Sequence, residues 1–310
     1  MSTALLNRQI LLMFCLMLVG YLINRLAFMH PQTADDLTKI LLNIVSPCLI
    51  LNAFQQPFSS DRLTQLALAS LAMLLFYLLE ILVTQLLFKS VQDPNLKRAA
   101  KYGSVYSNAG FMGVPLASAL FGQNGVFFAV VSLAAFNLFN WTHGSALFQE
   151  TASPADKIKK ILLNPNIITI VFGLIIFLTR FQLPKIASAT IAAISTINTP
   201  LSMIIIGSSL ATIKIRKEIT NPYVWFVILL RNLLFPIAAI LILQALSVTN
   251  TAFYTTVLMA ACPTAGLVVL FTIQAKGNPS PAIAIMGLST ILSLVTIPAI
   301  FYLANWLMAL

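Results

Sequence analysis

Long apolar stretches separated by short polar connections run along the whole chain, and ten of them can be distinguished. Most approach the ~20 residues, at a rise of 1.5 Å each, that an α-helix needs to cross a hydrocarbon layer about 30 Å thick. The pattern therefore predicts an all-α membrane protein with ten transmembrane helices. The predicted spans are Leu5–Asn24, Leu37–Phe54, Leu63–Phe88, Lys101–Phe121, Val126–Phe148, Ile161–Thr179, Ile186–Ile213, Tyr223–Leu246, Ala252–Gln274 and Ala282–Asn305.

The two halves of this pattern match each other. Moving residues 1–155 along the chain by 153 positions places the first five spans over the last five, and Pro47 over Pro200. Five is an odd number, so the second half must enter the membrane from the side opposite to the first. The sequence thus predicts two inverted repeats, 1–155 and 156–310, a plan that recurs in secondary transporters.

The composition excludes a soluble globule. Hydrophobic residues make up 59% of the chain and charged residues 8%, and the mean hydropathy is +0.93. Such a chain cannot hide its apolar surface in one core, so lipid must surround most of it. The net charge of +10 does not indicate nucleic-acid binding, because the basic residues lie in short connections between spans.

The basic residues are unequally distributed between the two faces of the predicted bundle. Of the 18 lysines and arginines, 13 lie in or beside the connections after spans 1, 3, 5, 7 and 9, and Arg231 lies inside span 8. The other face holds only Arg8, Arg62, Arg180 and Lys185. Because positive loops stay in the cytoplasm, we expect a multi-pass protein of the cell membrane with both termini outside.

Spans 4 and 9 carry helix-breaking residues near their middles. Span 4 contains SNAGFMGVP, with Asn108, Gly110 and Pro115, and span 9 contains ACPTAG, with Pro263 and Thr264. Proline removes a backbone donor and clashes with the preceding turn, and glycine destabilises a helix by about 1 kcal/mol relative to alanine. Backbone groups freed inside a bilayer must meet protein, water or substrate, so we expect both breaks to lie beside a cavity.

These breaks also indicate what the cavity holds. The second half of each broken helix would begin near the midplane with free N–H groups and about half a positive charge. In an inverted repeat these two ends approach from opposite sides and converge, so a small anion is the expected occupant. The alternative is that the glycines only permit close helix packing or a kink.

Few charged or titratable side chains lie inside the predicted spans. Glu80 in span 3 and Arg231 in span 8 both lie roughly 12–14 Å from the predicted cytoplasmic end, so they can pair. Either they form a structural salt bridge, or Glu80 binds a proton and Arg231 contacts the anion. His143 fits hydrogen-bonded packing better than a proton relay. Asn137 fits a polar path or a helix–helix hydrogen bond equally well.

Five stretches carry a family resemblance. They are SNAGFMGVP from Ser107, LNP from Leu163, TPLSMIIIGSSLA from Thr199, PTAGLVVL from Pro263 and LSTILSLVTIP from Leu288. In combination they resemble the auxin efflux carrier family, the bacterial relatives of the plant PIN carriers, over essentially the whole chain. The resemblance implies a fold similar to that of bile acid/sodium symporters and sodium/proton antiporters. In that fold, helices 1, 2, 6 and 7 form a scaffold, helices 3–5 and 8–10 form a mobile transport domain, and helices 4 and 9 cross at the substrate site.

The resemblance also implies a cargo and one site residue. Bacterial members are described as permeases for malate, malonate or similar carboxylates, whereas the plant members export the indole carboxylate auxin. Asn108 matches the family's amide in helix 4, so the resemblance gives it a binding role. In helix 9 of this chain Pro263 is followed by Thr264, without an asparagine nearby. A symmetric site with two amides is therefore not implied.

We interpret the chain as a secondary or facilitative transporter of a small organic anion by alternating access. Asn108, Thr264 and the helix-end amides would hold the carboxylate, and Ser46, Asn52 and Asn137 would complete a polar wall. Proton symport, exchange and uniport all stay open, as does a homodimer. No motif indicates a metal, a cofactor or a disulfide. An anion channel is the first rival and an intramembrane enzyme the second; an enzyme is disfavoured because the spans hold one carboxylate and one histidine, on different segments.

Overall fold

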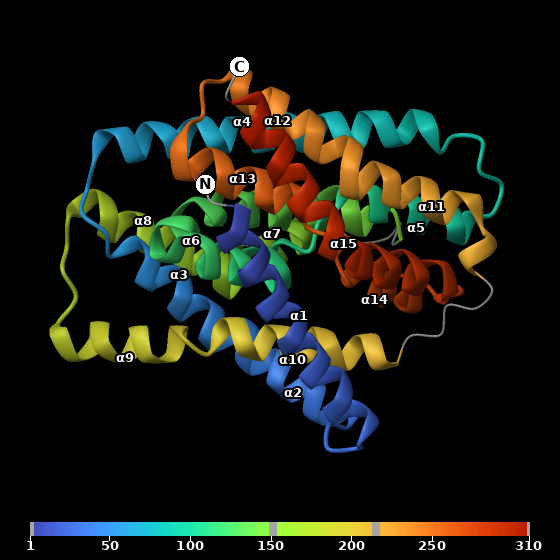
Figure 1. The fold of residues 1–310 in the computed structure, drawn as a ribbon, viewed down its shortest axis with the longest axis horizontal. Coiled ribbons are helices and arrows are strands. Elements are labelled where there is room, and N and C mark those ends of the chain that lie inside the picture. The colour runs from blue at the N-terminus through green and yellow to red at the C-terminus, as the bar shows by residue number, and fades with distance from the viewer. Residues whose placement is uncertain (1–2, 149–153, 213–217, 309–310) are drawn as a thin grey trace.

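The computed structural model of the protein describes residues 3–148, 154–212 and 218–308 (Figure 1). Within these ranges the regular elements are helices, and seven of them are long and apolar enough to cross a membrane. These seven are Asn7–Arg25, Pro31–Phe54, Ser60–Leu87, Ala109–Gly144, Lys185–Ala211, Pro222–Ala245 and Ser280–Leu307. The predicted all-α membrane architecture is thereby confirmed, whereas the ten-helix inverted repeat stays a prediction.

The elements are α1 (Thr3–Arg25), α2 (Pro31–Ile40), η1 (Leu41–Val45), α3 (Ser46–Phe54), α4 (Ser60–Leu87), α5 (Pro94–Val105), η2 (Ala109–Gly113), α6 (Val114–Phe139), η3 (Asn140–Gly144), α7 (Pro154–Leu162), α8 (Pro165–Thr179), α9 (Lys185–Ser195), α10 (Asn198–Ala211), η4 (Glu218–Thr220), α11 (Pro222–Leu229), η5 (Leu230–Leu234), α12 (Phe235–Ala245), α13 (Asn250–Ala261), α14 (Leu267–Gln274) and α15 (Ser280–Leu307).

The count of seven differs from ten for three reasons. Predicted spans 4 and 9 are interrupted, between α5 and η2 and between α13 and α14. Predicted span 6 corresponds to α8, which has only 15 residues. Finally, α6 joins the end of span 4 to span 5, because only Gly122, with φ 60° and ψ −148°, separates its two helical stretches. Glycine tolerates this backbone conformation because it has no Cβ.

Three wide helical turns of the π type lie just before prolines. The turn η1 precedes Pro47, η2 precedes Pro115 and η5 precedes Pro236. Proline lacks an N–H group, and its ring clashes with the carbonyl four residues earlier. A π turn accommodates both effects by shifting the hydrogen bond by one residue. Pro47 and Pro115 therefore widen their helices without ending them.

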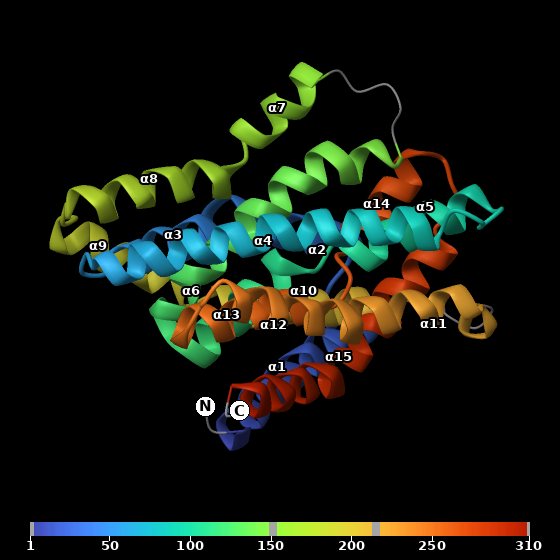
Figure 2. The same ribbon diagram turned by 90° about the horizontal axis from the view of Figure 1, so that it is seen from above.

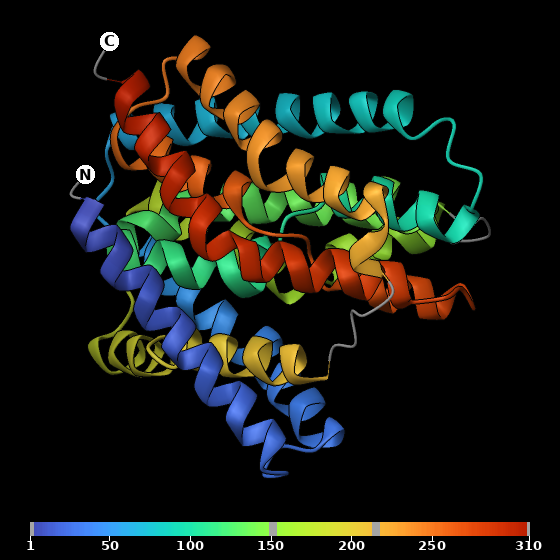
Figure 3. The same cartoon turned by 45° about the vertical axis from the view of Figure 1, so that its right-hand side comes forward.

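Figures 1 and 3 show two groups of helices, with α1, α2, α9 and α10 on one side and α4, α11, α12, α13 and α15 on the other. The helices α3 and α6 pack against each other between these groups. The helices α1 and α15 contact each other, and Figure 2 shows both along the same edge of the bundle. The side of the membrane on which the two termini lie stays a prediction, as does the division into scaffold and transport domain.

The contact between α1 and α10 depends on two glycines that let the backbones approach closely. A Cβ at Gly20 would lie 2.1 Å from the carbonyl oxygen of Ile204, and a Cβ at Gly207 would lie 1.8 Å from that of Met17. Small residues at such crossings are typical of helix packing in membranes.

We expect Gly207→Ala to destabilise the protein by about 3 kcal/mol or more, because backbone atoms cannot yield to the added methyl group. The measurement is the thermal unfolding midpoint in detergent. The matched control is Gly110→Ala, whose Cβ would meet only the Leu133 Cδ1 atom, at 3.6 Å. Equal midpoints for the two variants would contradict the close contact between α1 and α10.

Candidate functional site

The two interrupted helices meet at their breaks in the centre of the bundle. Ser107 and Thr264 form an isolated antiparallel β-bridge. Its hydrogen bonds run from the Asn108 N–H to the Pro263 carbonyl (2.6 Å) and from the Ala265 N–H to the Tyr106 carbonyl (2.8 Å). The two short non-helical segments, 106–108 and 262–266, thus satisfy part of each other's backbone hydrogen bonding, as the interior of a membrane protein requires. We call this meeting point the crossover.

Four backbone N–H groups remain free where the helices resume. They belong to Gly110 and Phe111 in η2 and to Gly266 and Leu267 at the start of α14, and none donates a hydrogen bond to another described residue. Such groups are the usual orphan donors of a helix N-terminus, where the helix dipole adds partial positive charge. At the crossover, two such ends lie together.

A cavity of about 500 Å³ adjoins these free donors. Gly110 and Gly266 both line it, and because glycine has no side chain, they line it with backbone atoms. The polar side chains in the lining are Thr38, Asn43, Asn108, Asn137, Asn164, Asn166, Ser209 and Thr290. The apolar ones include Phe111, Leu133, Phe136, Trp141, Ile205, Ile206, Leu210, Leu267, Leu270 and Met286. Among the described residues no charged side chain lines the cavity, so its polar groups are neutral dipoles.

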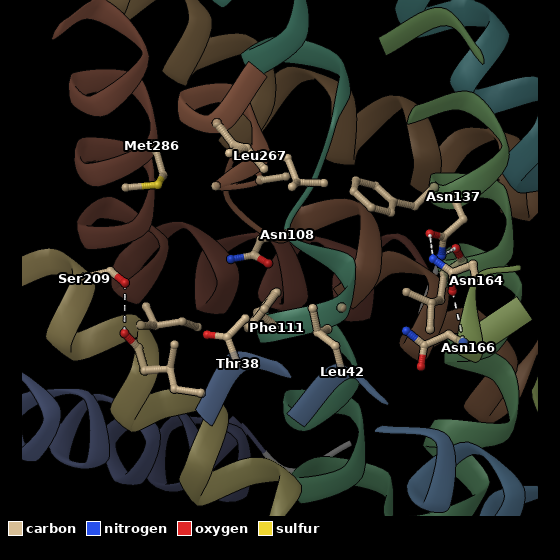
Figure 4. A pocket seen from close by; sticks show the side chains of 18 of the residues that line it. Thr38, Leu42, Asn108, Phe111, Asn137, Asn164, Asn166, Ser209, Leu267 and Met286 are labelled. Carbon is tan, nitrogen blue, oxygen red and sulfur yellow. Dashed lines mark hydrogen bonds between the residues drawn. The ribbon is translucent and has the colours of Figure 1, made fainter. Parts of the chain in front are cut away.

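Asn108 lies at the centre of this cavity. Figure 4 shows its side chain between Leu267 and Met286 on one side and Thr38 on the other. Its backbone is held by the crossover bond to Pro263, whereas its side-chain amide makes no hydrogen bond to a described residue. A fixed backbone with a free amide leaves this side chain available to a ligand.

A group of asparagine amides lines the side of the cavity that lies opposite Met286 and Ser209 (Figure 4). Asn164 caps α8 by accepting from the N–H groups of Asn166 and Ile167. Its own Nδ2 donates to the Asn137 Oδ1 at 3.1 Å, and the Asn137 Nδ2 donates to the Leu133 carbonyl at 2.8 Å. The sequence left open whether Asn137 lines a polar path or forms a helix–helix hydrogen bond. In the structure it does both, because it lines the cavity and accepts a hydrogen bond from the N-cap of α8. The sequence signal for Asn164 was its place before Pro165, which is typical of an N-cap.

Several residues that the sequence predicted for the binding site lie outside the cavity lining. The Thr264 hydroxyl donates to the Gly103 carbonyl at 2.7 Å, and its N–H donates to the Ser289 hydroxyl. Ser46 and Asn52 tie α3 to its neighbours, bonding Asn166 and Ser195. Pro115 and Pro263 contribute their carbonyls to hydrogen bonds with Thr199 and Asn108. These residues support the crossover or the bundle, whereas Gly266, which the prediction omitted, lines the cavity.

Glu80 and Arg231 form the ion pair that their similar depths allowed. Arg231 Nη1 lies 2.8 Å from Glu80 Oε1, and both side chains are completely buried. The guanidinium also donates to the carbonyls of Ser104, Val105 and Ala260. These carbonyls belong to the last turns of α5 and α13, where carbonyls lack helical partners and carry partial negative charge. Arg231 therefore caps two helix C-termini at once.

The crossover consequently has two electrically different sides. The carbonyl ends of α5 and α13 meet Arg231, and the amide ends of η2 and α14 meet the cavity. Neither Glu80 nor Arg231 lines the cavity, so Arg231 does not contact a ligand bound there. One oxygen of the pair, Glu80 Oε2, has no partner among the described residues.

His143 is held through both ring nitrogens. Its Nδ1 lies 2.9 Å from the Tyr106 hydroxyl and its Nε2 lies 3.3 Å from the Gln85 amide nitrogen. The Lys101 ammonium, which can only donate, binds the Gln85 oxygen. The Gln85 amide must then donate to Nε2, which fits a neutral ring with its proton on Nδ1. This network joins α4, α5 and η3 and agrees with the predicted packing role.

We expect alanine at Gly110 or Gly266 to impair binding without impairing folding. The added Cβ would lie at ordinary contact distance, 3.6 Å from Leu133 Cδ1 or 3.4 Å from Met286 Sδ, but it would occupy space beside the free amides. Losing one charge-assisted hydrogen bond costs about 1.5–3 kcal/mol, or roughly a ten- to hundredfold rise in KM for uptake. Unchanged KM in both variants, at unchanged thermal midpoint, would contradict ligand contact at these amides.

Comparison with known proteins identifies the family. The family described as "Membrane transport protein" matches residues 6–301. A relative from Methanothermobacter thermautotrophicus, described as an uncharacterized transporter, is 24% identical over 294 residues, covering 94% of this chain and 96% of its own length. The resemblance to auxin efflux carriers is thus confirmed at the level of the family. With a match over nearly its whole length, the chain belongs to the membrane transport protein family.

Proposed function

We propose that the protein carries a small organic anion across the cell membrane by alternating access, and that the anion's carboxylate binds at the amide side of the crossover. The observation that carries this proposal is that the four residues with free backbone N–H groups all line one cavity. Paired helix N-termini bind anions without a full positive charge, which lowers the cost of releasing the cargo. The apolar lining suits the carbon skeleton of such an anion.

The exposed part of the cavity lining supports an inward-open state. Asn43, Ser209 and Leu270 are exposed lining residues. Asn43 lies one turn after Lys39, and Leu270 lies six residues before Lys276, so both are near the face where basic residues concentrate. By the distribution of positive charge this face is cytoplasmic. In alternating access, a second state would open the same cavity toward the opposite face.

The test is counterflow in proteoliposomes. Vesicles preloaded with an unlabelled carboxylate should transiently accumulate the labelled compound from outside. The screen would compare malate, malonate, monocarboxylates and indole carboxylates, each against its neutral amide. We expect one class of acid to show counterflow and its amide neither to be transported nor to compete, because the free N–H groups prefer a negatively charged acceptor. Equal transport of acid and amide would exclude an anion site.

The same assay separates the carrier from an anion channel. A channel gives flux that does not saturate and no counterflow, since it never exposes the site to one side at a time. The paired breaks around one cavity favour a carrier, as in other transporters with discontinuous helices.

Coupling to protons is a further proposal that depends on Glu80. Its buried position and unpartnered Oε2 are compatible with a carboxyl group that takes up a proton during the cycle. Glu80→Gln removes the titration and keeps a hydrogen-bonding group of the same shape. If this variant folds and its uptake keeps the wild-type pH dependence, Glu80 is a structural partner of Arg231 only.

A further inference from the structure

A second hollow, of about 770 Å³, lies where α3, α8 and α9 end or begin, away from the crossover. Arg180 and Lys185 line it, together with the side chains of Gln55 and Gln56. Arg62 lies nearby and donates to the carbonyl of Pro57, another lining residue. Three of the four basic residues on the sparsely charged face of the protein therefore gather around one hollow.

Most polar groups around this hollow are hydrogen-bond donors that have no acceptor among the described residues. The Gln55 oxygen accepts from the Ser188 hydroxyl at 2.7 Å, which leaves its amide nitrogen buried without an acceptor. The Gln56 amide nitrogen is likewise buried without an acceptor. Arg180 lies over the Phe58 ring at 4.8 Å and, like Lys185, makes no ion pair with a described residue. Buried donors without acceptors are rare in proteins, and together with Arg180 and Lys185 they make this hollow favourable to an anion.

No described carboxylate near the hollow neutralises the positive charge of Arg180 and Lys185. Among the described residues that line it, none is acidic. Asp61, in the first turn of α4, is exposed and next to Arg62, but it forms no ion pair with Arg180 or Lys185. The local charge is therefore positive.

An apolar hollow of about 750 Å³ adjoins the first one and shares Arg180 and Phe181 with it. It continues along α8 past Phe172 and Ile175, whose side chains are 56% and 51% exposed. In a membrane protein, exposed apolar side chains on a helix as apolar as α8 are expected to face lipid tails. The two hollows together thus form a surface with a basic end and an apolar extension, meeting at Arg180.

We propose that this surface is a binding site for one anionic phospholipid. The phosphate of the headgroup contacts Arg180 and Lys185, with the two glutamine amides buried behind them, and one acyl chain lies along Phe172 and Ile175. A small free anion would use the donors but would leave the apolar extension empty, so the adjoining hollows favour a lipid. Scattered basic residues that only anchor helix ends at the interface would not surround a common donor-lined hollow.

The test measures lipid binding to the full-length protein in a neutral detergent. Native mass spectrometry and thermal unfolding would be recorded with added phosphatidylglycerol, phosphatidylcholine or inorganic phosphate. We expect phosphatidylglycerol alone to remain bound and to raise the unfolding midpoint. Arg180→Gln/Lys185→Gln should weaken this binding about tenfold or more, the effect of losing charge-assisted hydrogen bonds.

The matched control is Arg8→Gln/Lys89→Gln, which removes the same charge from exposed side chains elsewhere. It should bind phosphatidylglycerol like the wild type. Equal weakening in both double variants, or an equal midpoint shift with inorganic phosphate, would overturn the lipid site. If the first double variant does not fold, Lys185→Gln alone, at an exposed position, takes its place, and an unchanged affinity would then overturn the proposal.

Discussion

Asn108→Asp should abolish carboxylate uptake while leaving the fold intact. The side chain projects into the middle of the cavity without a hydrogen bond to the described residues, so its replacement breaks no internal contact. A carboxylate about 4 Å from a bound anion repels it by about 4 kcal/mol at an effective dielectric constant of 20. We therefore expect uptake to fall by about two to three orders of magnitude, measured as initial rates in proteoliposomes.

Two variants control this prediction. Asn278→Asp makes the same change on an exposed residue whose side-chain oxygen accepts from the Ser280 N–H, an interaction that aspartate retains, and its uptake should equal that of the wild type. Asn108→Ala removes the amide without adding charge and should reduce uptake less than Asn108→Asp does. If Asn108→Asp transports at the wild-type rate, the anion does not bind beside Asn108.

Arg231→Met should be the most destabilising single substitution at the crossover. It leaves Glu80 buried without its partner and removes the donor from three carbonyls at the ends of α5 and α13. Breaking a buried pair by removing one partner costs about 3–5 kcal/mol. In a protein of this size the corresponding fall in the thermal unfolding midpoint is about 5–8 °C.

The double variant Glu80→Gln/Arg231→Met separates the two roles of Arg231. It restores electrical neutrality but leaves the carbonyls uncapped, so only part of the lost stability should return. Full recovery of the wild-type midpoint would show that the carbonyl contacts contribute nothing. In that case Arg231 would be a charge partner for Glu80 and not a cap for the two helix ends.

The sequence predicted the breaks well because proline and glycine act locally. Gly110 and Pro263 identified interruptions that the structure places at 106–108 and 262–266. The similar depths of Glu80 and Arg231 likewise showed that the two could pair, since position along a membrane helix follows directly from residue count. Helix breaks and the depth of a charged residue in the membrane can thus be predicted from one sequence.

The hydrogen-bond partner of each polar side chain could not be predicted in the same way. Asn108 and Thr264 occupy similar places beside the two breaks, yet Asn108 projects into the cavity whereas Thr264 donates to Gly103. The rotation of each helix about its axis and the identity of the neighbouring helix decide between these outcomes. Neither can be predicted from the pattern of a single sequence. Gly266 was not predicted for the site, although Gly110 at the other break was; both glycines line the cavity with backbone atoms.

The most direct test of the crossover as an anion site is an experimental structure of the protein with a transported carboxylate bound. We expect the carboxylate oxygens to lie within hydrogen-bonding distance of the backbone N–H groups of Gly110 and Gly266 and of the Asn108 amide, with Arg231 still bonded to Glu80. A carboxylate bound to Arg231, or one that contacts neither glycine, would contradict the assignment of the amide side of the crossover to the cargo.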